Sequence, residues 1–187
     1  MSFRFQVMNE QSARAVLSWV YPPPYLIYNE DPLRMEQVVQ ELLRPDYHYY
    51  TLAEGRDSLV AYCCCGLDAR VGGGDYDDNS LDLGLMVRPD LNGLGRGGEY
   101  AGAVLQFARR HFPQRRWRVT IAEFNQRAQR VWSKLGFVRV QTFARQGDGT
   151  AFGVWVLAGA NQADEPQPRG SWKQAGPPRI IRPTNRI

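Results

Sequence analysis

The chain of 187 residues lacks the features that mark membrane and secreted proteins. It has no apolar run near the ~20 residues that a membrane-spanning helix needs. Residues 1–7 resemble a short strand rather than the apolar stretch of a secretory signal. Mean hydropathy is −0.45, and 43% hydrophobic with 12% aromatic residues are enough to fill a core. We therefore expect a globular, cytoplasmic protein without a membrane segment.

The chain is also poor in residues that bind metals or form disulfides. Its three cysteines, Cys63, Cys64 and Cys65, are consecutive, and neighbouring side chains on a strand point to opposite faces. The two histidines, His48 and His111, lie far apart in the sequence, without ligand-like spacing around them. We predict three buried strand cysteines, no metal site and no disulfide.

The net charge of +4 is weak support for a nucleic-acid partner, because most of it lies near the C-terminus. Residues 161–187 hold five Lys/Arg against Asp164 and Glu165, so this stretch carries +3 and the remainder only +1. So small a charge gives no strong field for binding phosphate backbones, and we expect no nucleic-acid partner. Prolines, glycines and polar residues dominate the same stretch. We predict one domain over residues 1–160 and a tail over 161–187 that is disordered or docked.

Hydrophobic periodicity predicts an α+β fold. The strand–helix–strand order over residues 81–122 predicts that the strands at its two ends are parallel, whereas turn sequences elsewhere predict antiparallel hairpins. The prolines at 22–24 favour an extended segment over residues 21–29 that presents aromatic rings. Helices are expected over 10–20, 33–43, 99–112 and 126–135, and strands over 47–54, 58–66, 81–87, 117–122, 137–144 and 152–158.

A glycine-rich segment joins the strand at 81–87 to the helix that follows it. Glycines allow close approach of the backbone to a ligand, and the N–H groups at the start of a helix favour a phosphate. Gly93, Gly95 and Gly98 match the G-x-G-x-x-G of dinucleotide-binding folds, with Glu123 in the place of the ribose-binding acid. In those folds the first glycine follows the strand at once, whereas here residues 88–92 intervene. A Walker loop is excluded, since no Lys-Ser/Thr pair follows the glycines.

The same segment resembles the GNAT acetyltransferase superfamily, whose acyl-CoA loop has the form Gln/Arg-x-x-Gly-x-Gly/Ala after a strand and a turn like Val-x-Pro. Residues 87–97 read Val-Arg-Pro-Asp-Leu-Asn-Gly-Leu-Gly-Arg-Gly. Residues 125–137 read Asn-Gln-Arg-Ala-Gln-Arg-Val-Trp-Ser-Lys-Leu-Gly-Phe, similar to the family's Asn-x-x-Ala, aromatic, Leu-Gly-Phe signature. The resemblance spans residues 3–158. It implies the GNAT fold, a mixed and mostly antiparallel sheet with a parallel, splayed strand pair and flanking helices.

In function, the resemblance implies an N-acetyltransferase that moves an acetyl group from acetyl-CoA directly to a primary amine of a small molecule, protein or peptide. The loop amides would hold the CoA pyrophosphate, while the strand end and Asn125 would hold the pantetheine arm. Tyr25 and Tyr28 would line the acceptor site, and a homodimer is compatible with the family. The implied cofactor-binding residues are Met86, Val87, Asn92, Gly93, Leu94, Gly95, Arg96, Gly97, Gly98 and Asn125.

Candidate catalytic residues follow from the chemistry of amide formation. Asp82 and Glu123 are placed to deprotonate an amine, although either carboxylate could instead face solvent or pair with an arginine. Trp132 occupies the place of the family's usual Tyr, which is often proposed to protonate the CoA thiolate. An indole N–H is a far poorer proton donor than a phenol. Asn92 replaces the family's Gln or Arg.

Two alternatives to an efficient acetyltransferase remain open. The change at Trp132 is compatible with a catalytically weak domain that binds CoA without much turnover. The glycine spacing alone is compatible with a dinucleotide-binding oxidoreductase.

Overall fold

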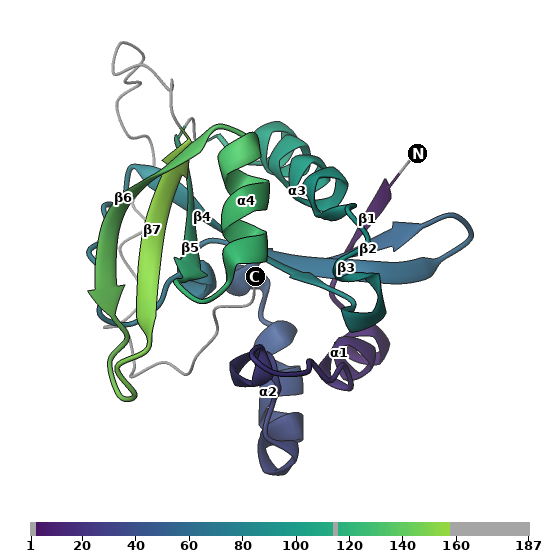
Figure 1. The fold of residues 1–187 in the computed structure, drawn as a ribbon. Coiled ribbons are helices and arrows are strands. Elements are labelled where there is room, and N and C mark those ends of the chain that lie inside the picture. Colours follow the sequence, from purple (N-terminus) through teal and green to yellow (C-terminus); the bar gives the residue numbers. More distant parts are fainter. Residues whose placement is uncertain (1–2, 114–115, 158–187) are drawn as a thin grey trace.

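The computed structural model describes residues 3–113 and 116–157, in which one seven-stranded sheet has the strand order β1-β2-β3-β4-β5-β7-β6 (Figure 1). The predicted tail at 161–187 lies outside the described residues. Within those residues, no helix has both the length and the apolar character needed to span a membrane. The strands are β1 (Phe3–Val7), β2 (Tyr49–Glu54), β3 (Ser58–Cys65), β4 (Ser80–Val87), β5 (Arg116–Ala122), β6 (Phe137–Ala144) and β7 (Ala151–Leu157). The α-helices are α1 (Glu10–Leu17), α2 (Met35–Leu42), α3 (Gly97–His111) and α4 (Gln126–Lys134).

The strand pairs confirm the predicted mixed sheet. β4 and β5 are parallel, and the other five neighbouring pairs are antiparallel. The parallel register runs only from Ser80↔Arg116 to Asp82↔Arg118, although β4 continues to Val87 and β5 to Ala122. We call the opening between the unpaired halves of these two strands the splay. This arrangement differs from the repeated parallel sheet of a dinucleotide-binding fold.

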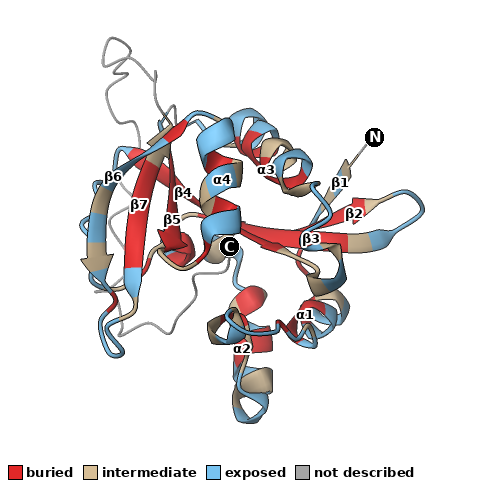
Figure 2. Ribbon diagram, viewed as in Figure 1, coloured by how far each residue is buried: buried red, intermediate tan, exposed pale blue. Residues whose placement is uncertain are grey.

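The helices cover the two faces of the sheet. α3 and α4 lie on one face, above an apolar cluster that includes Leu83, Leu85 and Ile121. α1 and α2 lie on the other face, over a cluster that includes Met86. Buried residues run through the central strands and the inner helix faces, while the outer helix faces are exposed (Figure 2). The splay therefore lies between two helical layers, α3 and α4 on one face and α1 and α2 on the other.

The three cysteines show this alternation directly. Cys63 and Cys65 pack on the α3 and α4 side, whereas Cys64 packs on the α1 and α2 side. All three are buried, which confirms the prediction of buried strand residues. Their side chains fill both layers of the core because adjacent strand residues face opposite sides.

The segment of residues 21–29, here called the tyrosine segment, is not extended as predicted. A short 3₁₀ turn forms at Leu26–Tyr28, and the Asn29 side chain closes the segment on the backbone of Tyr21. Asn29 Oδ1 accepts from Tyr21 N at 2.7 Å, and Asn29 Nδ2 donates to Tyr21 O at 3.1 Å. A side-chain amide can satisfy both backbone groups of a distant residue, which a local proline pattern does not reveal.

Candidate functional site

The glycine loop, residues 93–98, leads from the end of β4 into α3. Gly93 and Gly95 have φ of +83° and +80°, a backbone conformation that strongly favours glycine. A Cβ added at Gly93, Gly95 or Gly98 would meet no heavy atom of the described residues within 4 Å. The backbone at these three glycines therefore borders open space beside the start of α3, where a phosphate could approach the helix N-terminus.

Gly97 has a different role from its neighbours. A Cβ at this position would lie 2.9 Å from Val131 Cγ2 on α4. The missing side chain thus lets α3 and α4 pack closely beside the loop. Leu94 is exposed, and the Asn92 amide reaches only to 3.5 Å from the carbonyl oxygen of Val87.

Arg96 ties the loop to β2 by ion pairs. Its guanidinium donates to both carboxylate oxygens of Glu54, at 2.6 and 3.0 Å, and to Glu99 at 2.9 Å. The hydrogen bonds from Arg96 lower the pKa of Glu54 below its ordinary value. Two carboxylates already neutralise Arg96, so the backbone amides are left to attract an anion while Arg96 holds the loop in shape.

The backbone of β4 offers hydrogen-bonding groups to the splay. Asp82 O accepts from Gly66 N at 2.8 Å, and Arg88 N donates to Val60 O at 2.9 Å, so these residues face β3. Antiparallel pairing alternates, which turns the amides of Met86 to β3 and those of Leu85 and Val87 to the splay. Leu85 was missed by sequence reasoning, because the alternation is known only once the partner strand is known.

The tyrosine segment contacts the ends of both strands that border the splay, β4 and β5. Tyr21 Oη donates to the carbonyl oxygen of Val87 at 2.9 Å, at the end of β4. Asn125 Nδ2, just beyond β5, donates to Tyr28 Oη at 3.2 Å, while Asn125 Oδ1 accepts from Ala128 N and caps α4. Burial raises the pKa of Tyr28, and its side chain is 7% exposed. Sequence reasoning missed Tyr21, although it lies in the segment that was singled out.

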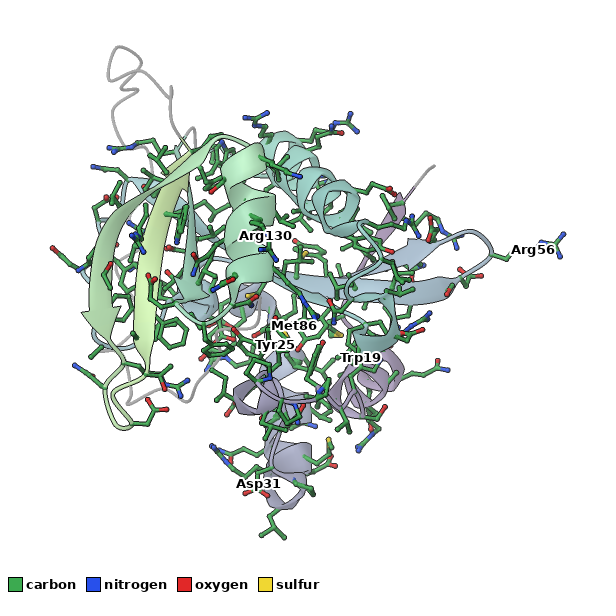
Figure 3. All side chains as sticks on the ribbon, viewed as in Figure 1. Trp19, Tyr25, Asp31, Arg56, Met86 and Arg130 are labelled. Carbon is green, nitrogen blue, oxygen red and sulfur yellow. The ribbon has the colours of Figure 1, made fainter. Side chains whose placement is uncertain are left out.

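Tyr25 lies on the outer side of the same segment. Its ring is 5.9 Å from that of Phe124 and 6.3 Å from that of Tyr28, and the guanidinium of Arg127 sits 5.1 Å from its centroid. Figure 3 shows Tyr25 and Met86 near the lower end of α4 in this view, between the sheet and the layer of α1 and α2. Tyr25 and Tyr28 are thus together on the face opposite α3.

Asp82 is locked in a buried ion-pair network at the closed end of the splay. Arg118 Nε lies 2.5 Å from Asp82 Oδ1, and Arg70 Nε lies 2.7 Å from Asp82 Oδ2. Asp82 and Arg118 are each 2% exposed, and the Arg118 guanidinium lies 4.9 Å from the ring centroid of Tyr76. Asp82 is therefore an ion-pair partner of arginines, which is one of the roles that the sequence left open for it.

Glu123 leans away from the splay. Its carboxylate is bound by Arg139 Nη1 at 2.9 and 3.1 Å, on the far edge strand β6. Glu123 Oε1 would lie 2.7 Å from a Cβ at Gly153, which places the side chain over β7 rather than toward β4. The structure does not bring Asp82 and Glu123 together.

Trp132 is a core residue of the α3 and α4 face. It is 0% exposed and makes an edge contact with Phe137, with ring centroids 4.9 Å apart. Its indole Nε1 has no hydrogen-bond partner among the residues that the structure describes.

Comparison with known proteins yields one family and many similar folds. A model of the acetyltransferase (GNAT) domain matches residues 4–138. No curated protein sequence matches the chain significantly. Spermidine N-acetyltransferase from Vibrio cholerae, solved with CoA and spermine, has a TM-score of 0.64 at 12% identity, covering 83% of this chain and 94% of that one. AAC(6')-Ib, solved with ribostamycin and coenzyme A, has a TM-score of 0.66 at 16% identity, covering 84% and 93%.

An acetyltransferase of the GNAT family from Bacillus anthracis is similar to the same degree. Its TM-score is 0.64 at 14% identity, with 84% of this chain and 95% of that one covered. At such identities the likeness concerns the fold, and the mixed α+β sheet with one parallel pair agrees with it.

Proposed function

Because the chain belongs to the acetyltransferase (GNAT) domain family, we propose that it moves an acetyl group from acetyl-CoA to the primary amine of a small molecule, protein or peptide. Acetyl-CoA is the cosubstrate of this family. The observation that carries the proposal is the open glycine loop at the start of α3, placed directly beside the splay. The loop and the splay together offer a site for a phosphate and, next to it, a site for an extended chain such as pantetheine.

The residues present fit acetyl-CoA. The amides of residues 94–98 would hold the pyrophosphate, since the dipole and free N–H groups at a helix start favour an anion. Leu85 would bind the pantetheine arm through its backbone groups that face the splay, and Val87 through its N–H, because the Val87 carbonyl already accepts from Tyr21 Oη. When bound, acetyl-CoA supplies an acetyl group activated as a thioester. No metal or covalent enzyme intermediate is part of the proposal.

The acceptor amine would approach from the face opposite α3. The glycine loop would hold CoA on the α3 side, which would leave the α1 and α2 side, with Tyr25 and Phe124, for the second substrate. The similar proteins solved with amines hold spermine and ribostamycin, which supports amine acetylation here as a class. Since Asp82 and Glu123 are paired with arginines, we propose that the acceptor amine loses its proton to water.

Calorimetric titration with acetyl-CoA, CoA and NADH tests the proposal. We expect the wild type to bind both CoA compounds at about micromolar Kd and to bind NADH far more weakly. A Gly95→Trp variant should lose CoA binding, because the indole would fill the open side of the loop. Binding of NADH without binding of CoA would overturn the acetyltransferase proposal in favour of a dinucleotide enzyme.

A catalytically weak CoA-binding domain is the second candidate function, and the buried Trp132 is the observation that favours it. A Trp132→Tyr variant separates the two. A large gain in turnover at unchanged acetyl-CoA affinity would indicate native chemistry impaired by the tryptophan. Unchanged turnover in an active enzyme would show that the proton comes from another source.

A further inference from the structure

Tyr28 carries a buried hydroxyl that donates its proton to none of the residues that the structure describes. Its oxygen accepts one hydrogen bond, from Asn125 Nδ2 at 3.2 Å. Among residues 3–113 and 116–157, no acceptor is found for the Tyr28 O–H itself. A phenol donates as readily as it accepts, and an idle buried donor is uncommon in native proteins. The proton of Tyr28 is therefore available to a ligand.

Contacts with the ends of both strands that border the splay, β4 and β5, set the position of this hydroxyl. Asn125 binds it at the end of β5, and Tyr21, whose ring lies 6.3 Å from that of Tyr28, is bound to Val87 O at the end of β4. Asn29 closes the segment that carries both tyrosines. Tyr28 is thus held near the ends of β4 and β5, where the splay is open, on the face of the sheet opposite α3.

A pantetheine arm that starts at the glycine loop would extend along the end of β4. It would follow the backbone N–H of Val87 and the backbone groups of Leu85 into the splay, toward the point where β4 and β5 pair at Asp82↔Arg118. The reacting sulfur at the end of the arm would therefore lie between the two strands. Trp132 is an inferior donor for that sulfur, because an indole N–H does not release its proton to a thiolate.

We propose, on the basis of the proposed acetyl transfer, that Tyr28 is the catalytic acid that protonates the departing CoA sulfur in place of Trp132. In this step the amine nitrogen forms a bond to the acetyl carbon, and the carbon–sulfur bond breaks with its electron pair moving to sulfur. The Tyr28 O–H proton transfers to that sulfur. The nitrogen loses a proton to water, and the Tyr28 phenolate regains one from solvent after CoA leaves.

Desolvation raises the pKa of Tyr28, which keeps the phenol protonated before the transfer but makes it a weaker acid. The hydrogen bond from Asn125 acts in the opposite direction and lowers the pKa. Asn125, which donates to the phenol oxygen, stabilises the phenolate that forms on transfer.

An equilibrium binding cycle tests the contact between Tyr28 and sulfur. CoA and desulfo-CoA, which lacks the sulfur, are titrated into the wild type and into Tyr28→Phe. We expect the wild type to bind CoA about 3–10-fold more tightly than desulfo-CoA, as a single hydrogen bond would produce. Tyr28→Phe should bind the two compounds equally. Tyr25→Phe, a change of the same kind on the neighbouring stacked ring, should keep the wild-type difference.

Kinetics provide the second measurement. Tyr28→Phe should lower kcat about 100-fold or more, as expected for loss of a general acid, at unchanged KM for acetyl-CoA. If Tyr28→Phe weakened the binding of CoA and of desulfo-CoA equally, Tyr28 would contact the pantetheine arm rather than the sulfur, and the inference would be overturned. An unchanged kcat would overturn it as well. Failure of both compounds to bind the wild type would instead overturn the proposed function, so the two failures are distinct.

Discussion

At the scale of single residues, the two carboxylates that chemistry singled out are both held by arginines. Asp82 is enclosed by Arg118 and Arg70, and Glu123 is drawn across β7 to Arg139. A general base needs a carboxylate that reaches the substrate proton, directly or through one water. Each of these groups instead has its lone pairs engaged by a guanidinium.

We expect Glu123→Gln to change kcat/KM by less than about threefold, whereas loss of a true general base lowers the rate ~10²–10⁴-fold. The glutamine keeps an oxygen for Arg139 while removing the charge. Steady-state acetylation of a simple primary amine, followed by thiol release, measures the effect. A drop of two orders of magnitude with unchanged thermal stability would restore Glu123 as the base.

We expect Arg118→Met to destabilise the fold by about 3–5 kcal/mol, because it leaves the buried charge of Asp82 with one partner fewer. Urea unfolding followed by circular dichroism measures the loss. The double variant Asp82→Leu with Arg118→Met should recover much of it, since both charges are then removed. A double variant as unstable as the single one would show that packing, and not charge, dominates here.

At the scale of elements, α3 combines two kinds of glycine within its first turns. Gly97 allows close packing on Val131 of α4, whereas Gly98 borders open space on the side of the proposed phosphate. Gly102 lies farther along the helix, where an added Cβ would meet Leu135 Cδ2 at an ordinary 4.0 Å. Neither Gly98 nor Gly102 has a positive φ. The two positions therefore form a matched pair of helical glycines at different distances from the loop.

We predict that Gly98→Ala and Gly102→Ala each stabilise the protein by about 0.5–1 kcal/mol, since alanine loses less backbone entropy in a helix. Only Gly98→Ala should weaken acetyl-CoA binding, by about tenfold, because its methyl group obstructs a charge-assisted backbone contact. Thermal unfolding and calorimetry measure the two effects. Equal affinities in both variants would move the pyrophosphate away from the start of α3.

At the scale of the whole molecule, arginine–carboxylate pairs stabilise turns and loops. Three of them lie within one turn each, Arg44–Asp46, Arg88–Asp90 and Arg145–Asp148, and Arg96–Glu54 joins the glycine loop to β2. Hydrogen bonds from arginine are the largest cause of the lowered pKa in each of four carboxyls, Asp46, Glu54, Asp90 and Asp148. A carboxyl with a lower pKa in the folded state stabilises the fold above its unfolded pKa, and this stabilisation is lost as pH falls through the folded value.

The melting temperature should therefore be nearly flat from about pH 5.5 upward and fall steeply below about pH 4, where ordinary carboxyls titrate. Differential scanning calorimetry at a series of pH values measures this dependence. Asp148→Asn should flatten the acid limb, because it removes a carboxyl paired with Arg145. An unchanged limb in that variant would assign acid sensitivity to the other pairs.

The sequence by itself determined the order of elements, the parallel pair β4 and β5, the glycine loop and the family. These features depend on local periodicity and on short motifs, which are carried by contiguous residues. Element ends differ from the predicted ones: α1 stops at Leu17 rather than at residue 20, and β2 begins at Tyr49 rather than at residue 47, after a 3₁₀ turn at Pro45–Tyr47.

Only the tertiary structure decided the partners of the candidate site residues. Asp82 meets Arg118 because β4 and β5 pair in one register, and Glu123 meets Arg139 across a glycine of β7. Tyr28 meets Asn125 over a separation of 97 residues. Whether a carboxylate is a base or an ion-pair partner, and whether a phenol is idle or bonded, depends on such long-range contacts. These contacts follow from packing, so no local pattern of residues reveals them.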